Sequence, residues 1–443
     1  MFNWRKPLIY FLLYITGSKI PRYFKEIKKI SSAPIEQQKQ YQENKLKVLL
    51  LYASQNVPYY ERVLKEAGVV KNNEVFLENF DKIPILTKQI IRREEKNLIS
   101  RIKRRGAYEN LSGGSTGEPI SFFQDKYYNE WNTADKLFIK KNNGQNVGDK
   151  ELRLWGSERD LLEGKEKFSI RVRNWIYNRT EINAFKLSET SLTNFVLKWN
   201  KFKPNSVESY VHPLHELARF IKNRQIKIFF PRSITTSAGT LYFEIKKDIE
   251  EVFGCKVFNR YGSREAGNIA CSNDDSGELR INFWNNYVEV LDHDEKAVLS
   301  KQSGKVYITT LNNFIMPLIR YNIGDMATLS TNYGKLEKIE GREMNMLKTK
   351  SGKMIPCEFF ILFVGITFNK NCFFKYQLIQ KSLDLLEIKV VLKNKNSFEE
   401  QKEKIETCIR GEMSDDNLVI RWVFVDDIPP LPSGKYCYSI SEI

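Results

Sequence analysis

Hydrophobic and polar positions alternate along the chain in a way that predicts strands and helices in turn. Leu46, Leu49, Leu50 and Ala53 recur at helical spacing, which predicts an amphipathic helix ending before Val57-Pro58. From about residue 200 to 262, short apolar runs typical of strands alternate with segments of helical period. The predicted strands there are 206–210, 226–230, 234–237 and 255–261, and the helices carry Leu214, Leu217, Ala218 and Ile221, then Leu241, Ile245, Ile249 and Val252 up to Gly254. This alternation predicts an α/β fold of sheets covered by helices.

The pattern changes toward the C-terminus. Segments 306–311 and 318–321 are predicted strands near the end of the large region. Beyond Gly341-Arg342 the sequence predicts strands at 373–380, 387–392 and 418–425 and a charged helix at 397–410. We therefore expect a large N-terminal domain, 1–340, followed by a small α+β C-terminal domain, 341–443.

Residues 1–35 form a lead segment with its own character. Between basic residues lies the apolar run 7–15, far shorter than the roughly 20 residues that a membrane-spanning helix needs. No small-residue cleavage site follows it, which argues against a secretory signal. Two interpretations stay open: a helix packed in the core, or a basic, aromatic segment lying in a membrane interface.

Composition narrows the classes of function. The chain has 443 residues, 42% hydrophobic and 28% charged, and a net charge of +16 that would attract anions such as nucleotides or anionic lipid. No zinc-finger spacing or aromatic RNA-binding stretch is visible, so we expect no nucleic-acid partner. Six scattered cysteines fit a reducing, cytoplasmic compartment, and three histidines make a zinc site improbable.

A glycine-rich segment, Ser112-Gly113-Gly114-Ser115-Thr116-Gly117, is the first candidate for chemistry. Glycines let backbone N–H groups curve around phosphate oxygens, and Ser115 and Thr116 add hydroxyl donors. The segment is not a Walker loop, and residues 119–123 after it favour a strand rather than the helix of a Rossmann fingerprint. By itself such a loop is more often a surface turn.

A second candidate, Tyr261-Gly262-Ser263-Arg264-Glu265, directly follows a predicted strand. Open α/β sheets gather ligands at that edge. Glu265 is suited to hold Mg²⁺ and Tyr261 to stack on a flat base. Alone, this fragment is more commonly a turn with an exposed acid.

Two further residues lie toward the C-terminus. Segment 320–325 is predicted to end a strand, with Gly324 permitting a turn that presents Asp325 to the two hydroxyls of a ribose. Lys435 follows Pro432-Ser433-Gly434, a lead that can deliver an ammonium between two mutually repelling anions. Most lysines are solvated surface charges, so Lys435 gains interest only from the other motifs.

In this order, the motifs resemble the adenylate-forming (AMP-producing) ligase superfamily, in the phenylacetate–CoA ligase-like branch that includes capsular polysaccharide biosynthesis proteins. The resemblance runs from about residue 35 to the end and includes segments 56–60, 83–88 and 235–239. It implies adenylation of a small carboxylic acid by MgATP, then transfer to an amine or thiol acceptor. The acceptors it implies are a nucleotide-sugar, a lipid-linked sugar, CoA or a carrier protein.

The resemblance also implies a role for each matching residue. Ser112 to Gly117 would hold the pyrophosphate end of ATP, Tyr261 would stack on adenine, and Gly262 and Ser263 would also bind the nucleotide. Glu265 would bind Mg²⁺, Asp325 the ribose, Arg342 the nucleotide at the hinge, and Lys435, on a mobile lid domain, both reacting anions. The acid would lie against 206–215 and 235–240, where the candidate residues are Tyr210, His212, Ser237, Ala238 and Gly239.

Some positions depart from the family pattern. Arg264 stands where Thr usually precedes the magnesium Glu, and would bind phosphate by charge. Met344 and Asn345 stand where an Asp pair is usual after the hinge, which puts the hinge and the second half-reaction in question. An aryl- or acyl-CoA ligase and a degenerate, non-catalytic homologue therefore remain alternatives, and peripheral contact with the inner face of the membrane stays open.

Overall fold

A computed structural model describes most of the chain, which divides into two compact units. Unit 1 comprises 1–323 and 328–338, and unit 2 comprises 324–327 and 339–443. The described residues are 3–112, 120–155, 168–183, 189–273, 276–342, 346–352, 354–355, 360, 364, 372–429 and 436–443.

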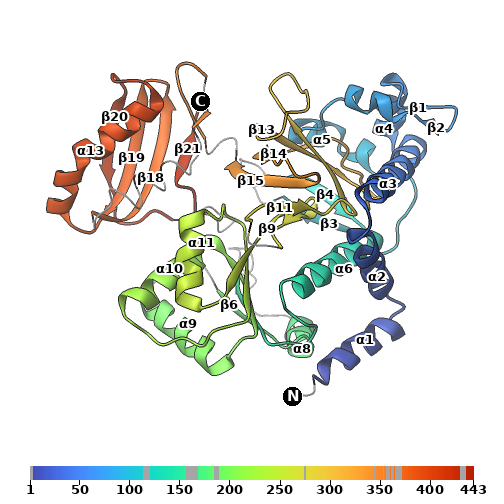
Figure 1. Cartoon of the computed structure of the whole chain (residues 1–443). Helices are drawn as coiled ribbons and strands as arrows, with labels where there is room; N and C mark the ends of the chain where they lie inside the picture. The colour runs from blue at the N-terminus through green and yellow to red at the C-terminus, as the bar shows by residue number, and fades with distance from the viewer. Residues whose placement is uncertain are drawn as a thin grey trace. The chain divides into compact units, whose positions relative to one another are not determined.

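Helices dominate the N-terminal part of unit 1 (Figure 1). Helix α2 packs on α6, with the rings of Tyr23 and Trp131 stacked at a centroid distance of 4.5 Å. The helix predicted around Leu46 is confirmed, because α3 ends at Asn56. The elements are α1 (Arg5–Ile15), α2 (Ile20–Ser31), α3 (Ile35–Asn56), α4 (Pro58–Glu66), β1 (Val70–Lys71), β2 (Glu74–Val75), η1 (Leu77–Lys82), α5 (Lys88–Glu94), η2 (Glu95–Leu98) and α6 (Lys126–Asn142).

An eleven-stranded sheet has the order β12-β13-β14-β15-β11-β10-β9-β8-β7-β5-β6. Its second half, β6-β5-β7-β8-β9, is parallel, which confirms the predicted α/β class. The left-handed cap at Gly254, with φ of 59°, ends α11 as the sequence predicts. This half consists of β5 (Glu151–Trp155), α8 (Phe168–Ile176), β6 (Arg179–Asn183), α9 (Glu189–Phe202), β7 (Ser206–Tyr210), α10 (Val211–Asn223), β8 (Ser233–Ser237), α11 (Phe243–Phe253) and β9 (Lys256–Ser263).

The rest of the sheet continues from β9, and the pairs β9–β10, β10–β11, β11–β15 and β12–β13 are antiparallel. A separate two-stranded hairpin of β3 (Tyr108–Leu111) and β4 (Ser121–Gln124) flanks the glycine-rich segment. The remaining strands of the large sheet are β10 (Gly267–Cys271), β11 (Leu279–Ile281), β12 (Asn286–Leu291), β13 (Ser303–Thr310), β14 (Tyr321–Leu329) and β15 (Lys335–Arg342).

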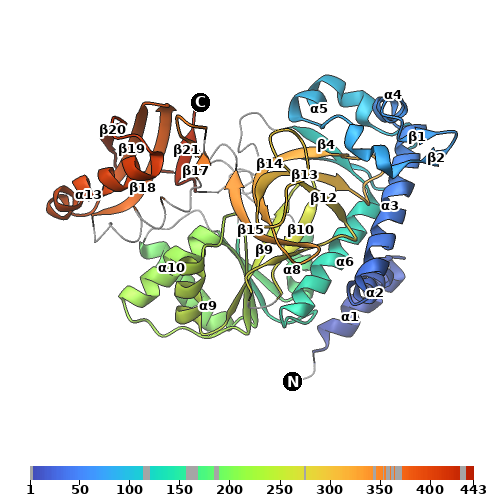
Figure 2. The same ribbon diagram turned by 45° about the horizontal axis from the view of Figure 1, so that its top comes forward.

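The two faces of the parallel strands differ in chemistry. Because side chains alternate along a strand, the in-register residues Leu152, Val207, Ile234 and Val257 share one face. Helices α9, α10 and α11 lie on one side of these strands and α6 on the other (Figure 2). The opposite face carries Glu151 and Arg153 on β5, Glu208 on β7 and Arg260 on β9. We call the two faces the apolar face and the charged face.

The strand predicted at 226–230 is wrong. The segment has no strand pairing, because one side chain from α9 replaces the ladder. The Asn200 side chain donates to the backbone oxygen of Lys227 at 3.0 Å and accepts from the backbone N–H of Phe229 at 2.7 Å. Trp199 Nε1 also donates to the Phe229 oxygen at 2.7 Å, so these backbone groups are satisfied without a neighbouring strand.

The strand predicted at 318–321, ending in a turn at Gly324, is also wrong. Strand β14 begins only at Tyr321 and runs through Gly324 and Asp325. Arg320 has φ of 50°, outside the extended region, and its buried guanidinium donates to Glu289 at 3.1 Å and to the Ile83 oxygen at 2.7 Å. These contacts hold the chain in a non-extended conformation up to that residue.

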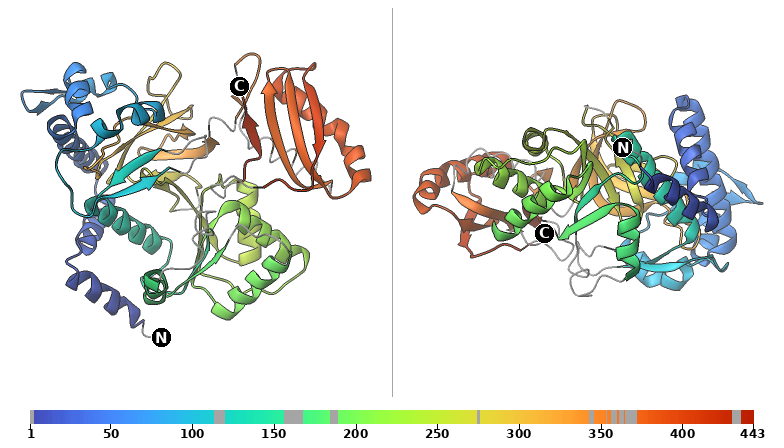
Figure 3. Two further views of the ribbon diagram at one scale, coloured as in Figure 1. Left: turned by 180° about the vertical axis from the view of Figure 1, so that it is seen from behind. Right: turned by 90° about the horizontal axis from the view of Figure 1, so that it is seen from below.

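Unit 2 contains a four-stranded sheet of order β20-β19-β18-β21, with α13 along one face (Figure 3). Phe398, Ile405 and Ile409 of α13 are buried against Leu378, Leu386 and Ile388. The strands and helix predicted beyond residue 370 are present with shifted ends. The elements are β16 (Leu347–Lys348), β17 (Met354–Ile355), β18 (Phe373–Ser382), β19 (Leu385–Leu392), α13 (Lys395–Met413), β20 (Val419–Phe424) and β21 (Ser439–Ser441).

Helix α1 is not a core helix. Of its residues only Ile9 is buried, while Phe11 is 59% and Tyr14 82% exposed. The apolar run 7–15 therefore does not form a core-packed helix, whereas α2, in the same lead segment, buries Tyr23 and Ile27. Within the described residues, no helix combines the length and apolarity needed to cross a membrane.

Candidate functional site

The base of the glycine-rich segment is closed by Ser112. Its backbone N–H donates to the Ile120 oxygen at 2.9 Å, and its hydroxyl accepts from the Ile120 N–H at 2.9 Å. Ser112 is 4% exposed, so these two buried hydrogen bonds hold the two ends of the segment together. Gly113, Gly114, Ser115, Thr116 and Gly117 lie outside the described residues.

The β9–β10 connection carries the second motif. A Cβ atom on Gly262 would lie 2.4 Å from the Gly267 oxygen, so this close approach of two strands requires glycine. The ladder is irregular between Asn268 and Ala270, next to Tyr261, and the Ser263 hydroxyl accepts from the Ala266 N–H at 3.0 Å. The glycine, the bulge and this hydrogen bond shape the turn that carries Arg264 and Glu265.

Hydrogen bonds hold this turn next to the glycine-rich segment. Gln124, the last residue of β4, donates to the backbone oxygen of Arg264 at 2.9 Å, and Tyr128 of α6 donates to that of Glu265 at 3.4 Å. Arg264 donates to the backbone oxygen of Leu111, one residue before Ser112, at 3.5 Å. The fold therefore brings the base of the predicted phosphate loop and the predicted magnesium ligand together.

The carboxylate of Glu265 is suited to a cation. The residue is only 7% exposed, and among the described residues no hydrogen bond or ion pair involves its carboxylate. A carboxylate removed from most of its water without a partner is costly, and Mg²⁺ binds such oxygens. No group of three or more His, Cys, Asp or Glu side chains gathers among the described residues, so a metal here would share its coordination with substrate phosphates and water.

Asp325 and Arg342 form an ion pair in unit 2. Arg342 Nε lies 2.8 Å from Asp325 Oδ1, and both side chains are mostly buried. Gly324, with φ of 78°, lets the Arg342 guanidinium approach, because a Cβ there would lie 3.3 Å from Arg342 Nη1. The two predicted nucleotide contacts are therefore in direct contact. Lys435, Met344 and Asn345 lie outside the described residues.

The predicted acid-binding residues gather at the carboxyl ends of β7 and β8. Tyr210 and Ser237 are register partners, and both are buried. Ala238 follows with φ of 59°, a left-handed conformation unusual for a residue with a Cβ, and a Cβ on Gly239 would lie 3.2 Å from Val211. His212 lies in the first turn of α10.

The charged face was not predicted from the sequence. Arg153 lies 2.7 Å from Glu208 and 3.0 Å from Glu151, and Arg260 lies 2.6 Å from Glu208. Arg179 lies 3.0 Å from Glu151, and Lys140 contacts Glu151 and, at 3.5 Å, Glu208. The available signal was the period-two alternation of Glu151-Leu152-Arg153-Leu154-Trp155, which marks a strand with one charged face.

These contacts set the protonation of the two carboxylates. Although burial acts to raise it, the cations Lys140 and Arg153 lower the pKa of Glu151 to about 2. Burial also acts to raise the pKa of Glu208, but the cations Arg153 and Arg260 outweigh it. The pKa of Glu208 therefore lies well below its ordinary value. Both carboxylates are therefore ionised at neutral pH.

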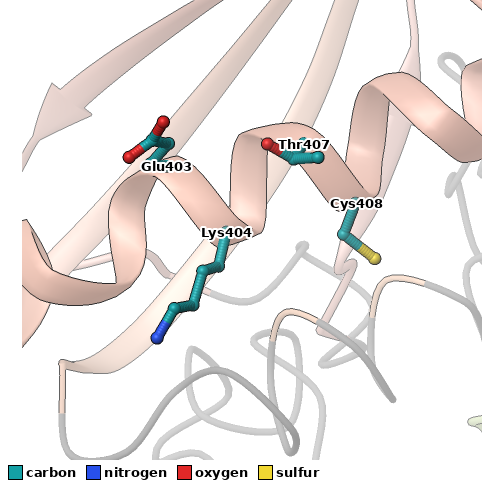
Figure 4. Close-up of a pocket in the computed structure, with 4 residues that line it drawn as sticks. All are labelled: Glu403, Lys404, Thr407 and Cys408. Atoms are coloured by element: carbon teal, nitrogen blue, oxygen red, sulfur yellow. The ribbon is translucent and has the colours of Figure 1, made fainter.

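A hollow of about 400 Å³ lies on α13 in unit 2 (Figure 4). Its described lining residues are Glu403, Lys404, Thr407 and Cys408 on one side of that helix. None of the predicted site residues is among these described lining residues.

Comparison with known proteins agrees with this architecture. Residues 347–442 match the family model of the CapK C-terminal domain. Protein CapK of Staphylococcus aureus is 26% identical over 433 residues, covering 95% of this chain and 92% of CapK. The phenylacetate–coenzyme A ligase of Thermus thermophilus is 24% identical over 358 residues, covering 74% of this chain and 76% of that protein.

A solved structure shares the fold. The crystal structure of 2-hydroxyisobutyryl-CoA ligase in complex with R3-HIB-AMP superimposes with a TM-score of 0.70, at 15% identity, covering 93% of this chain and 90% of that one. The solved structure shows the fold of the chain. The likenesses in sequence to CapK and to phenylacetate–coenzyme A ligase support the adenylate-forming ligase superfamily as its class. Within that class, they support the phenylacetate–CoA ligase-like branch.

Proposed function

We propose that the protein activates a carboxylic acid with ATP, releasing pyrophosphate, and transfers the acyl group to an acceptor. The observation that carries the proposal is the buried carboxylate of Glu265, which no described residue pairs. Gln124 and Tyr128 hold the backbone oxygen of Glu265 next to the base of the glycine-rich segment. A buried carboxylate that lacks a partner among the described residues is suited to a cation that accompanies a nucleotide.

The first step requires two anions to meet. The carboxylate of the acid attacks the α-phosphorus of ATP, the bond to the β-phosphate oxygen breaks, and pyrophosphate leaves. Backbone N–H groups of 113–117 would bind the leaving phosphates, Arg264 would add positive charge, and Lys435 would orient both reacting groups. Mg²⁺, when bound by Glu265, supplies charge neutralisation on the phosphate oxygens.

Other residues would position the nucleotide and the acid. Tyr261 would stack on adenine, Asp325 would bind the ribose and Arg342 would contact the nucleotide. The acid would lie at the ends of β7 and β8, against Tyr210 and Ser237. We further infer that 341–443 is a mobile lid that rotates between the two half-reactions, with 1–340 binding ATP and substrate.

The acceptor is an amine or a thiol. The family resemblance implies transfer to a sugar amine in capsule polysaccharide biosynthesis, whereas likeness to phenylacetate–coenzyme A ligase supports CoA as the acceptor. Consumption of CoA in the presence of acid and ATP distinguishes the two. A degenerate homologue would bind no ATP in calorimetry.

Pyrophosphate release tests the role of Glu265. A panel of small carboxylic, amino and uronic acids is first screened with the wild type. Glu265→Gln should then lower the rate with the best acid by about a hundredfold or more, because it removes a charge that the metal requires. Glu66→Gln, at an exposed carboxylate at the end of α4, is the control and should have wild-type activity. Equal rates for Glu265→Gln and wild type would refute the assignment.

We also infer that α1 contacts the inner, anionic surface of the membrane. Its Phe11 and Tyr14 are exposed, and basic residues of α1 and α2 accompany them, as in helices that lie in a membrane interface. Sedimentation with phosphatidylglycerol vesicles at low salt should retain the wild type, and the double variant Phe11→Ser, Tyr14→Ser should lose retention. Equal sedimentation of both proteins would exclude this contact.

A further inference from the structure

The side-chain amide of Gln124, the last residue of β4, uses both its nitrogen and its oxygen in hydrogen bonds. Its Nε2 donates to the backbone oxygen of Arg264 at 2.9 Å and to that of Glu265 at 3.3 Å. Its Oε1 accepts from the Tyr108 hydroxyl at 2.9 Å and from Asn110 Nδ2 at 3.2 Å, both on β3. Because both ends of the amide are engaged, its orientation is fixed. Gln124 therefore ties the hairpin that flanks the glycine-rich segment to the turn that carries Glu265.

A second side-chain amide holds the same turn. Asn286, the first residue of β12, donates through Nδ2 to the backbone oxygen of Ala266 at 3.2 Å and to that of Asn268 at 2.9 Å. We call the side chains of Gln124 and Asn286 the amide clamp. The amide clamp holds four backbone oxygens of the segment 264–268.

Asp135 of α6 supports the amide clamp from within the core. Its carboxylate accepts from Asn268 at 2.9 Å and from Asn282 at 3.3 Å. The backbone oxygen of Asn282 in turn accepts from the backbone N–H of Asn286 at 3.1 Å. Asn282, Asn286 and Gln124 are each 1% exposed. The amide clamp is thus part of a buried polar network in which each member fixes the position of the next.

A connection that only reverses the chain does not need such a network. Turns lie at the surface as a rule, where water satisfies their backbone oxygens. At the β9–β10 turn, buried side chains from β4 and β12 take the place of water, although burial of an amide is costly unless its hydrogen bonds are good. The network therefore indicates that the exact position of this turn matters. The buried carboxylate that the turn presents is that of Glu265.

We propose that Gln124 and Asn286 are positioning residues, which fix the direction of the Glu265 carboxylate toward the metal that accompanies ATP. The inference rests on the proposed function for the identity of that metal complex. Neither amide has to touch the substrate, because both act through the backbone of the turn. Since Gln124 also binds β3, it sets the separation between Glu265 and the base of the glycine-rich segment, and both of these are proposed to meet the same phosphates.

The first test measures pyrophosphate release, with the best acid of the panel, as a function of Mg²⁺ concentration. Gln124→Met and Asn286→Leu keep the approximate volume of each side chain and remove its donors. Each should lower kcat about tenfold to a hundredfold, the cost of a misplacement of about 1 Å. Each should also raise the Mg²⁺ concentration that gives half the maximal rate, with little change in KM for the acid.

The control for a general loss of stability is Asn200→Ala. This substitution also removes two hydrogen bonds to the backbone, but on the segment 227–229. It should keep the wild-type dependence on Mg²⁺. An equal change of the Mg²⁺ dependence in Asn200→Ala and Gln124→Met would overturn the inference.

A double-mutant cycle separates positioning from folding. If Gln124 acts through Glu265, Gln124→Met should have little further effect on the rate once Glu265→Gln has removed the charge that the metal requires. A structural role would instead lower the rate by the same factor in both backgrounds. That second result would contradict the inference.

Hydrogen exchange tests the amide clamp without any activity. In the protein without nucleotide, exchange of the backbone amides of 261–268 should be about tenfold or more faster in Gln124→Met and Asn286→Leu than in the wild type, because the turn loses buried hydrogen bonds. Unchanged exchange in both variants would overturn the inference whether or not ATP binds. Absence of MgATP binding to the wild type in calorimetry would refute the proposed function, whereas faster exchange in the variants would still support the amide clamp.

Discussion

Both faces of the parallel strands are buried, but they are built on opposite principles. On the apolar face, Leu152, Val207 and Ile234 are at most 2% exposed and need only neighbours of suitable volume. On the charged face, Glu208 is 5% exposed and depends on Arg153, Arg260 and Lys140 for compensation of its charge. The apolar face is stabilised by burial itself, whereas the charged face is stable only while each buried charge keeps its ion-pair partners.

The difference also decides how each face responds to substitution. On the apolar face, a smaller side chain leaves a cavity, and its cost depends on the volume removed. On the charged face, removal of one member of an ion pair leaves the other charge buried without compensation. We therefore expect the larger losses of stability on the charged face.

The largest effect is expected from adjacent residues that point to opposite faces. Glu208→Ala leaves three cations without their shared carboxylate and should lower the free energy of unfolding by about 3–5 kcal/mol. Val207→Ala, on the apolar face, should lower it by about 2 kcal/mol. Urea denaturation measures both. A smaller loss for Glu208→Ala than for Val207→Ala would contradict the contrast between the faces.

The pH dependence of stability offers a second test, at Asp135 of α6. This buried carboxylate accepts from Asn268 at 2.9 Å and from Trp284 at 2.9 Å, and burial nevertheless raises its pKa to about 6 from an ordinary 3.8. The folded state then binds the proton more tightly than the unfolded state. The contribution of this proton at Asp135 to the free energy of unfolding, about 3 kcal/mol, is complete below about pH 4 and is lost as pH rises through about 6.

The measurement is the free energy of unfolding of wild type and Asp135→Asn between pH 4 and 7. The difference between the two proteins should change with pH in this window, since Asn has no proton to lose. A constant difference would mean that Asp135 titrates normally. Glu151, with its pKa lowered by cations, should act in the opposite direction, losing its contribution as pH falls below about 4.5.

A smaller effect is expected on the apolar side, at Asn200 of α9. Asn200→Ala removes two hydrogen bonds to the segment 227–229 and should lower the free energy of unfolding by about 1–2 kcal/mol. Hydrogen exchange at the Phe229 amide should accelerate more than at Val207 in the adjacent strand. Unchanged exchange at Phe229 would show that this side chain does not replace a strand ladder.

The smallest effect should have the opposite sign. Lys136→Met removes a cation of α6 whose pKa is lowered by burial and by the nearby Arg260, so it should leave stability unchanged or raise it by less than about 1 kcal/mol at pH 7. Because the pKa of Lys136 is lowered, its cost is present below about pH 8 and vanishes above the ordinary value of 10.5. Thermal unfolding at pH 7 and pH 10 measures this. Clear destabilisation by Lys136→Met would indicate a structural role.

Sequence patterns predicted the elements whose pattern is local. Helix α10 and strands β7 and β8 follow from periodicity within a few residues, and the αL cap of α11 follows from Gly254. The segment 226–230 has an equally strand-like composition, but its backbone partners come from Asn200, about one helix earlier in the chain. Periodicity carries no information on such a partner.

The same limit applies to the candidate site. Motif order predicted Glu265 and Ser112, but their proximity depends on Gln124 and Tyr128, whose roles no motif marks. The charged face was missed because its ion pairs join residues of β5, β7 and β9, which meet only in the folded sheet. Whether a charged side chain has a partner can be decided only when its neighbours in the folded chain are known.

The ion pair between Asp325 and Arg342 has a consequence for control of the reaction. If Asp325 binds the ribose, the nucleotide shares this carboxylate with an arginine at the start of the C-terminal region, and occupancy of one partner alters the energy of the other. Thermodynamic reciprocity then requires that whatever reorients Arg342 also changes nucleotide affinity, by the same factor in both directions. Binding of a nucleotide at Asp325 would thus change the energy of Arg342 at the start of the C-terminal region.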